Sequence, residues 1–202
     1  ETWGKEWQQI FNPSKCKLLV VSNTTVATPV LSLSGVPLTC EPHLRCLGIW
    51  IDSKLSWEVH INHFCQRAIT RLHMIQRGVA TTWGFHPTIV RRLVDATILP
   101  TLFYAAPVWC SALRARSTRL APIDRVLRLC GIGIMGLHRT VSGDAARMVA
   151  GIIPAEFQLR ERVVDFYLRH LTYGEDLAST DSTPHGTHIG PIEILQSELR
   201  RL

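Results

Sequence analysis

The sequence predicts an α+β fold in which helices dominate. Up to about residue 55, short apolar runs rich in β-branched residues alternate with turn residues, which is typical of strands and hairpins. From residue 57 onward, apolar residues recur at steps of three and four, which is typical of helices. Of the 202 residues, 46% are hydrophobic and 19% are charged, so the chain can bury a core and is not disordered overall.

Three runs make up the expected β region. The apolar run Lys17-Leu18-Leu19-Val20-Val21-Ser22 predicts a strand, and Val30-Leu31-Ser32-Leu33 followed by Gly35 predicts a hairpin. Residues 45–51 predict a buried strand. Gly48 interrupts that run, and glycine inside a strand marks a bulge or the close approach of another backbone.

The first expected helices occupy the middle of the chain. Residues 57–79 predict an amphipathic helix that carries Arg67 and Arg71 one turn apart on its outer face. Pro87 stands near the start of a second helix that ends at Leu99. Residues 102–113 fit a third helix, and Pro100 is expected to separate the second helix from the third.

Later helices are marked by capping residues. Ser117 is the expected N-cap of a helix that runs to Cys130, is ended by the glycines at 131, 133 and 136, and bears Arg119, Arg125 and Arg128 outside. Ser142 caps a short helix to Ala150, followed by Gly151, and Pro154 opens a long helix through Leu171. Residues 172–188 read as a linker, and 192–202 as a short helix whose partner is missing.

The positive charge gathers in the middle of the chain. The formal net charge is +6, but residues 60–139 hold 11 arginines and two aspartates, a net charge of +9. A polyanion such as nucleic acid is the physical partner of such a surface. Arginines that merely solvate the outer faces of helices are the competing interpretation.

Cysteine usage and apolar length bear on the compartment. The six cysteines include no CxxC pair, which favours free thiols in an intracellular, reducing compartment over a disulfide scaffold. The uncharged stretch 96–113 contains Pro100 and Pro107, so we expect buried helices there and no membrane partner. The chain opens on Glu1 with no signal-type segment, so we expect a fragment of a longer protein.

Three other groups of residues give weaker indications of a functional site. Cys40, His43 and Cys46, and likewise His60, His63 and Cys65, are zinc-type ligands, but Cys46 and Cys65 are expected to face the core, and no metal site is predicted. The glycines at 131, 133 and 136 form a GxGxxG string, but it follows a helix where a dinucleotide site needs a strand. The six tryptophans are expected to be core or packing residues rather than platforms on which bases stack.

Five segments, taken in order, resemble one family. They are Asn12-Pro13-Ser14-Lys15-Cys16-Lys17, Arg45-Cys46-Leu47-Gly48-Ile49-Trp50-Ile51-Asp52, Leu55-Ser56-Trp57 with His60-Ile61, Ile98-Leu99-Pro100 with Tyr104 and Val108-Trp109, and Gly151-Ile152-Ile153-Pro154. Together they resemble the reverse transcriptases of non-LTR (LINE-type) retrotransposons over about residues 8–170. The sequence departs from the family at Cys46, where tyrosine is usual, and at Ala105, where glycine is usual.

The resemblance implies an arrangement of domains. Residues 1–55 correspond to the end of the polymerase palm with a primer-grip-like hairpin, 56–171 to the helical thumb or connection bundle, and 172–202 to a linker and C-terminal tail. The family's paired catalytic aspartates, which hold Mg²⁺ for nucleotidyl transfer, lie upstream of these segments. This chain has no Asp-Asp pair, so no catalytic residue and no metal ligand is assigned, and the fragment alone is expected to be inactive.

The resemblance also implies roles for particular residues. Lys15 matches a lysine near the phosphates of the incoming nucleotide, although a solvated lysine explains it equally well. Leu47 and Gly48 match the primer grip, which supports the primer's 3′ end, although an ordinary buried strand fits them too. Arg67 and Arg71, and with them Arg119, Arg125 and Arg128, become candidates for contacts to the duplex backbone.

We therefore expect a fragment of an RNA-directed DNA polymerase that grips the RNA–DNA template-primer as part of a larger polyprotein. A non-catalytic helical nucleic-acid-binding module from a decayed or co-opted retroelement is the alternative. A plain helical interaction domain is a third interpretation, and it predicts weak or no binding of hybrid duplex even at low salt.

Overall fold

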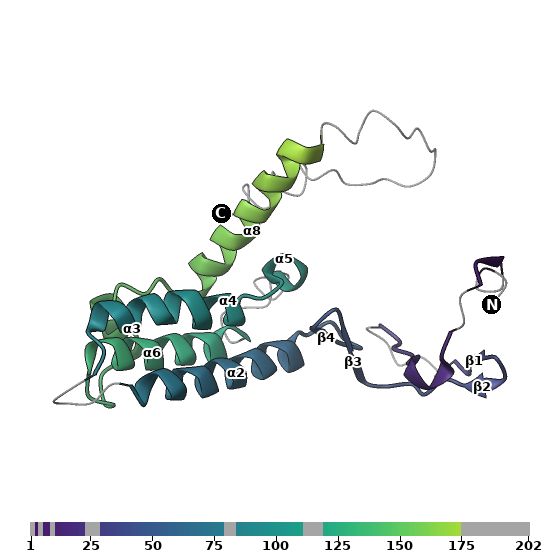
Figure 1. Ribbon diagram of the computed structural model, residues 1–202, viewed down its shortest axis with the longest axis horizontal. Helices are drawn as coiled ribbons and strands as arrows, with labels where there is room; N and C mark the ends of the chain where they lie inside the picture. The colour runs from purple at the N-terminus through teal and green to yellow at the C-terminus, as the bar shows by residue number, and fades with distance from the viewer. Residues whose placement is uncertain are drawn as a thin grey trace. The chain divides into compact units, whose positions relative to one another are not determined.

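The computed structural model describes residues 3, 6–8, 11–22, 29–78, 84–110 and 119–174. The chain divides into two compact units, Glu1–Phe64 and Cys65–Leu202. The described strands lie in the first unit and most of the described helices in the second (Figure 1). The predicted α+β, helix-dominated fold class is confirmed.

The first unit begins with irregular chain and a short hairpin. After the 3₁₀ turn η1 (Pro13–Lys15), strands β1 (Ser32–Leu33) and β2 (Val36–Pro37) pair antiparallel, with Leu33 opposite Val36. The hairpin predicted here is confirmed. The strand expected over 17–22 is wrong, because that run forms only a single parallel bridge, between Leu18 and Cys40. Its β propensity finds no continuous partner strand in the described chain.

A second hairpin replaces the single buried strand expected over 45–51. Strands β3 (His43–Cys46) and β4 (Ile49–Asp52) are antiparallel, with His43 opposite Asp52 and Cys46 opposite Ile49. The chain reverses at Leu47–Gly48. Gly48 therefore serves a turn rather than a bulge, and the apolar residues around it are exposed or half-buried.

Helix α2 (Glu58–Gln76) confirms the amphipathic helix predicted over 57–79. It begins in the first unit and continues in the second. The residues that recur at steps of three and four are buried, among them Ile61, Phe64, Ala68 and Leu72.

The next helix continues through a proline that was expected to break it. It consists of α3 (Pro87–Leu93), the π-helical segment η2 (Val94–Ile98) and α4 (Leu99–Leu102). The π turn gives Leu99 N–H the carbonyl of Val94, five residues back, and such a widened turn relieves the clash of a proline ring with the preceding turn. The break comes instead at 103–105, where Ala105 has φ +54° and precedes α5 (Ala106–Trp109).

The last three described helices are α6 (Ala121–Met135), α7 (Gly143–Val149) and α8 (Ala155–Gly174). Ser142 caps α7 and Gly151 adopts φ +66°, as predicted. The predicted N-cap Ser117 lies outside the described residues, and α6 begins at Ala121 without a side-chain cap. Helix α8 extends to Gly174, so residues 172–174 of the expected linker are helical instead. The rest of that linker and the helix expected over 192–202 lie outside the described residues.

Two of the three glycines expected to end α6 lie inside it. Only Gly136, at φ +62°, ends the helix. A Cβ on Gly131 would lie 2.5 Å from the carbonyl oxygen of Ala146, so Gly131 is where α6 and α7 approach closely. This contact outweighs the low helix propensity of glycine.

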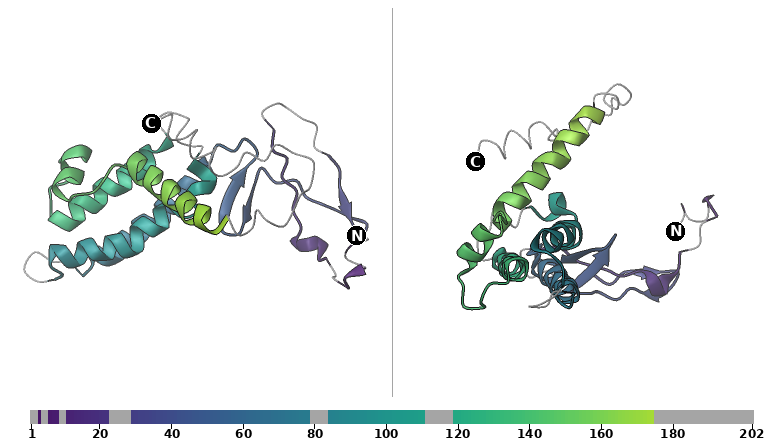
Figure 2. Two further views of the ribbon diagram at one scale, coloured as in Figure 1. Left: turned by 90° about the horizontal axis from the view of Figure 1, so that it is seen from above. Right: turned by 60° about the vertical axis from the view of Figure 1, so that its left-hand side comes forward.

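The helical unit is built around α6, which packs against α3 and α7, while α5 packs against α8. Its core includes Val94, Ile98, Trp109, Leu127 and Leu159, all below 2% exposed. Figure 2 shows α8 running away from the other helices of this unit. Within the described ranges, no helix is both long and apolar enough to cross a membrane.

Candidate nucleic-acid interface

The tip of the β3–β4 hairpin presents an apolar side chain to solvent. Leu47 and Gly48 both have positive φ, +47° and +85°, which is the geometry of a two-residue turn that follows the twist of the strands. Leu47 is 88% exposed. A leucine with positive φ lowers the free energy of unfolding by about 1 kcal/mol. Because Leu47 is exposed, burial of its side chain does not offset this loss. The hairpin implied by the resemblance is therefore present, with an exposed leucine at its tip.

Two side chains fasten this hairpin to the start of α2. The backbone N–H of Trp50 donates to Nδ1 of the buried His60 at 3.3 Å. The Asp52 carboxylate accepts from the backbone N–H groups of Ser56 and Trp57, both at 2.9 Å. Burial by itself would raise the pKa of Asp52, but these donors outweigh it and lower the pKa. Asp52 is thus a turn and capping residue.

Lys15 ends the 3₁₀ turn η1 and is exposed. Asn12 positions this turn, because its side chain accepts from the backbone N–H of Ser14 at 3.0 Å. Lys15 belongs to the same unit as Leu47 and Gly48, whereas the five candidate arginines belong to the other.

The two arginines of α2 have different environments. Arg67 is exposed on the outer face of the helix. Arg71 is half-buried and donates to the carbonyl oxygen of Thr97 at 3.0 Å and to the hydroxyl of Thr101. Its guanidinium therefore ties α2 to η2 and α4, next to the π turn.

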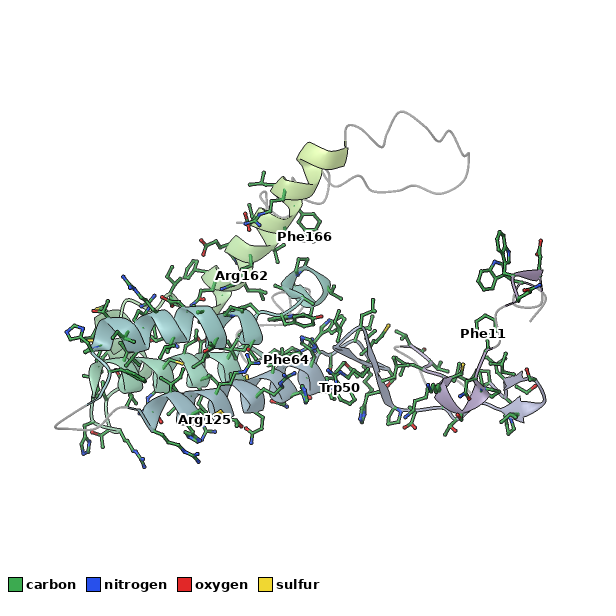
Figure 3. The ribbon with its side chains drawn as sticks, viewed as in Figure 1. Phe11, Trp50, Phe64, Arg125, Arg162 and Phe166 are labelled. Carbon is green, nitrogen blue, oxygen red and sulfur yellow. The ribbon has the colours of Figure 1, made fainter. Side chains whose placement is uncertain are left out.

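The three arginines near α6 also differ. Arg119 precedes the helix and is half-buried, whereas Arg125 is exposed (Figure 3). Arg128 donates to the carbonyl oxygen of Val141 at 3.1 and 2.9 Å and to that of Arg139. It therefore holds the loop that leads into α7, and the three do not form one uniform stripe.

Acidic residues neutralise part of the basic surface of the helical unit. The ion pairs are Arg91–Asp95, Arg147 with Asp124 and Asp144, Arg160–Glu156, and Arg169–Asp165. In the described part of this unit, four exposed arginines lack an acidic partner: Arg77, Arg92, Arg125 and Arg139. Positive charge thus remains available on the helical unit.

Sequence reasoning missed the structural use of Asp124 and Arg91. Asp124 accepts from the backbone N–H of Ala155 at 3.1 Å, at the start of α8, and pairs with Arg147 at 2.8 Å. Arg91 donates to the carbonyl oxygen of Ala150 while it pairs with Asp95. These contacts join residues 31 and 59 positions apart, so no local pattern reveals them.

The two sets of zinc-type ligands noted in the sequence, one around His43 and one around His60, do not come together as metal sites. No group of three His, Cys, Asp or Glu side chains in the described ranges can hold a metal ion. The His43 and His63 rings instead flank Trp50, each with a centroid distance of 5.6 Å. Cys46 is exposed, contrary to the prediction that it faces the core, because β3 ends at the hairpin tip.

The cysteines are free thiols, as the sequence predicts, whereas the tryptophans differ from one another in burial. All six cysteines are free thiols, and burial raises the pKa of Cys65 and of Cys130 to about 12, which makes both unreactive. Trp57 and Trp109 are buried as predicted. Trp3 and Trp7 are 57% and 62% exposed and therefore lie outside the core, but their rings pack on one another with a centroid distance of 6.4 Å. Trp83 lies outside the described residues.

Comparison with known proteins gives several relatives. The chain is 27% identical over 188 residues to the 115 kDa protein of the type-1 retrotransposable element R1DM of Drosophila melanogaster, covering 88% of this chain and 18% of that protein. It is 25% identical over 146 residues to a retrovirus-related Pol polyprotein from the type-1 retrotransposable element R1 4 of Nasonia vitripennis, covering 72% of this chain and 36% of the relative.

A third relative is the RNA-directed DNA polymerase from the Drosophila melanogaster mobile element jockey, 23% identical over 120 residues, which covers 59% of this chain and 13% of the relative. No family model and no solved structure matches the chain. It spans between about an eighth and a little over a third of the length of these relatives. The homologues of this chain are therefore R1 and jockey non-LTR retrotransposon polyproteins, at modest identity over much of its length.

Proposed function

We propose that this chain is the part of a non-LTR retrotransposon reverse transcriptase that holds the RNA–DNA template-primer. The observation that carries the proposal is the similarity to R1 and jockey polyproteins, one of them named as an RNA-directed DNA polymerase, over 59–88% of the chain. The rest of the parent polyprotein would supply the catalytic aspartates.

The charges support a partner with a phosphate backbone. Exposed arginines such as Arg67 and Arg125 lie on α2 and α6, and a guanidinium fork binds phosphate oxygens without reading sequence. Sequence-independent contact is what a polymerase needs from the part that holds its duplex. The turn at Leu47–Gly48 supports a primer-grip role, because it presents an exposed side chain and a glycine that allows a sugar-phosphate to approach.

The proposed Mg²⁺ belongs to the parent enzyme. The described residues of this chain do not fit it, since they include no cluster of carboxylates that can hold a metal ion. Asp52 is engaged by the backbone N–H groups of Ser56 and Trp57. On this proposal, the chain binds and positions the duplex, and the chemical step belongs to the rest of the parent polyprotein.

Binding of a labelled RNA–DNA hybrid, followed by fluorescence anisotropy, tests the proposal. We expect binding at about 50 mM salt that weakens steeply towards about 200 mM, because each phosphate contact releases counterions. Replacing Arg125 by Gln should weaken binding at every salt concentration. Arg169→Gln is the matched control, because Arg169 is already paired with Asp165.

A chain that fails to bind hybrid even at low salt contradicts the proposal and favours a helical protein-interaction domain. Binding that is strong but equal for hybrid and for double-stranded DNA favours the non-catalytic binding module. A preference for hybrid over duplex DNA supports the template-primer role, because A-form geometry is recognised by shape.

A further inference from the structure

His60 joins the β3–β4 hairpin to α2 through a hydrogen bond that only a neutral imidazole makes. The backbone N–H of Trp50 donates to Nδ1 of His60 at 3.3 Å. A backbone amide nitrogen only donates, so Nδ1 is the ring nitrogen that carries no proton, and the ring proton is on Nε2. A doubly protonated ring would present an N–H group to the Trp50 N–H in place of a lone pair.

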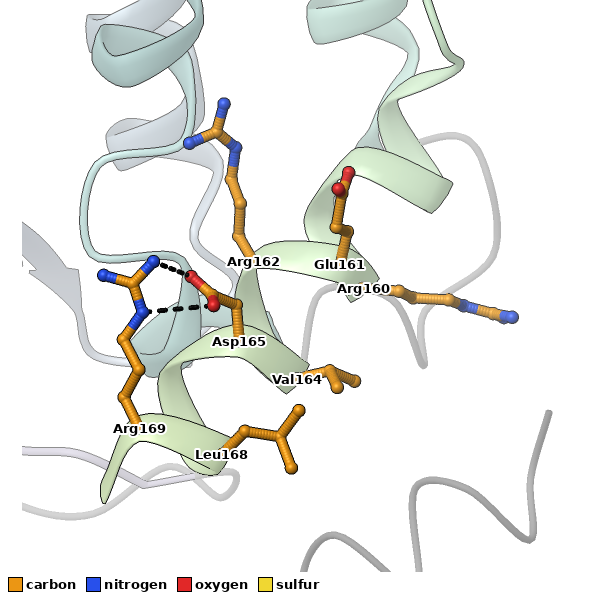
Figure 4. Close-up of a pocket in the computed structure, with 7 residues that line it drawn as sticks. All are labelled: Arg160, Glu161, Arg162, Val164, Asp165, Leu168 and Arg169. Atoms are coloured by element: carbon orange, nitrogen blue, oxygen red, sulfur yellow. Dashed lines mark hydrogen bonds and ion pairs between the residues drawn. The ribbon is translucent and has the colours of Figure 1, made fainter. Parts of the chain in front are cut away.

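The surroundings of His60 also oppose a positive charge on its ring. His60 is 1% exposed, and the Phe64 ring lies 4.7 Å from it, centroid to centroid. Trp50 and Phe64 mark this junction in Figure 3. Water solvates exposed charges such as those of Asp165 and Arg169 on α8 (Figure 4), but burial withholds that solvation from His60. The closed hairpin therefore favours the neutral ring through both the hydrogen bond and burial.

Other ionisable side chains surround this junction. In the described part of the first unit they are His43 and Arg45 on β3, Asp52 on β4, and Glu58 and His63 on α2. The rings of His43 and His63 flank the indole of Trp50, so a proton on either strengthens its attraction to that ring. His60 differs from them, because its protonation opposes the closed hairpin.

We propose that His60 is a pH-dependent lock of the β3–β4 hairpin. The neutral ring holds β4 on α2 and positions the turn at Leu47–Gly48, and the protonated ring releases them. Trp50 follows that turn by two residues, and its N–H points away from β3, as the N–H groups of alternate residues do in an antiparallel pair. A two-stranded hairpin is marginally stable by itself, so loss of this anchor reaches the turn.

Acid weakens this lock because the open hairpin binds one more proton than the closed hairpin. Opening exposes His60 to water, where a histidine ring takes up a proton as the pH falls below neutral. The lock is therefore complete at pH 7.5 and weaker at pH 5.5. Over this range the equilibrium constant for opening should rise by up to about tenfold, the limit for a ring that is neutral when closed and titrates normally when open.

Asp52 does not contribute to this pH dependence. Burial alone would raise the pKa of its carboxyl, but hydrogen bonds from the backbone N–H groups of Ser56 and Trp57 lower it below the ordinary value of 3.8. Asp52 therefore stays charged from pH 7.5 to 5.5, and a change within that range reports on histidine.

Hydrogen exchange of the full chain at pH 7.5 and 5.5 tests the lock. After correction for the intrinsic exchange rate at each pH, protection of the Trp50 amide should fall by up to about tenfold at pH 5.5. His60→Asn is the decisive variant, because its side-chain oxygen takes the place of Nδ1 and accepts the Trp50 N–H without titrating. Its protection should change by less than about twofold over the same range.

His63→Gln is the matched control, because His63 also lies on α2 and its ring contacts the same indole. This variant should keep the fall in protection that the unmodified chain shows. An equal fall in His60→Asn and the unmodified chain, a fall that disappears in His63→Gln, or constant protection in the unmodified chain overturns the proposal.

The ring nitrogens provide a measurement that needs no variant. In NMR spectra of the ¹⁵N-labelled chain at pH 7.5, His60 should show an unprotonated Nδ1 and a protonated Nε2. A proton on Nδ1 at this pH overturns the lock, whether or not His60→Asn folds.

One consequence of the lock rests on the proposed function. If the turn at Leu47–Gly48 supports a primer, the ratio of hybrid affinity at pH 7.5 to that at pH 5.5 should be larger in the unmodified chain than in His60→Asn, by up to about tenfold. Equal ratios in two chains that bind hybrid overturn the positioning of the turn. Absence of hybrid binding at both pH values contradicts the proposed function instead, and hydrogen exchange still decides the lock.

Discussion

The sequence pattern predicts that Arg71 is a surface cation, but its guanidinium joins α2 to the helical segments η2 and α4. Periodicity places it on the outer face of α2, one turn from Arg67, whereas in the structure it is half-buried and faces η2 and α4. That pattern does not reveal the carbonyl of Thr97 or the hydroxyl of Thr101, which lie 26 and 30 residues further along the chain. Its guanidinium is therefore engaged within the protein, whereas Arg125 points into solvent.

Replacing Arg71 by Ala is expected to lower the free energy of unfolding by about 1.5–3 kcal/mol, because it removes charge-assisted hydrogen bonds to partly buried oxygens. Arg71→Lys should recover only part of this, since a single ammonium does not reproduce the fork. Urea unfolding measures both, with Arg125→Ala as a control expected within about 0.5 kcal/mol of the unmodified chain. Equal stability of Arg71→Ala and the control contradicts the anchoring role.

Asp52 gives a pH-dependent prediction. Hydrogen bonds from Ser56 and Trp57 hold the pKa of its carboxyl below the ordinary value of 3.8 in the folded protein, so folding favours the charged form. The resulting stabilisation is fully present above about pH 4 and is lost as pH falls through the folded-state pKa. The stability advantage over Asp52→Asn should therefore be constant near neutral pH and shrink below about pH 4, as urea unfolding at a series of pH values measures. An advantage that grows on acidification contradicts the capping arrangement.

At the scale of elements, local signals identify three helices and most of their ends: apolar periodicity identifies α2, and the terminal residues Ser142, Gly151 and Pro154 identify α7 and α8. These local signals fail where an irregular helical turn or a contact with another helix determines the structure. Pro100 stays within a helix because of the adjacent π turn, and Gly131 stays within α6 because α7 lies against it. The apolar run at 17–22 has strand propensity, but within the described chain its single β-bridge is at Leu18.

The two glycines inside α6 provide a matched pair of substitutions. Gly131→Ala places its Cβ 2.5 Å from the carbonyl oxygen of Ala146, and backbone must move, so we expect a loss of about 1–3 kcal/mol. Gly133→Ala meets only the flexible amide of Gln76 and gains up to about 1 kcal/mol of helix propensity. Thermal unfolding of both variants compares them directly; equal effects argue against the close α6–α7 contact.

The β3–β4 hairpin separates stability from binding. Asparagine tolerates positive φ better than leucine, so Leu47→Asn should stabilise the first unit by about 0.5–1 kcal/mol. If the exposed leucine supports a primer, the same variant should bind template-primer more weakly. Urea unfolding and hybrid binding measured on the same preparation give both quantities, and improved stability with unchanged binding argues against a primer-grip role for Leu47.

At the scale of the whole molecule, the proposed function rests on the relatives of the chain and on its charge. The sequence motifs identify the retrotransposon homologues, and the comparisons confirm them. Which arginines remain available for a ligand depends instead on ion pairs such as Arg147–Asp124, which join residues 23 positions apart. The charge count thus predicts a class of partner, whereas the arginines left available for it depend on contacts between distant residues.

A single-substitution series identifies the contact surface. The four exposed arginines of the helical unit that lack an acidic partner in its described part, Arg77, Arg92, Arg125 and Arg139, are each changed to Gln. A residue that contacts a phosphate should reduce the slope of log K against log salt by about one, and a residue outside the interface should leave it unchanged. The variants that lower the slope therefore mark the face of the helical unit that lies along the duplex backbone, because counterions are released only where a guanidinium replaces them. Four unchanged slopes contradict backbone recognition by these arginines.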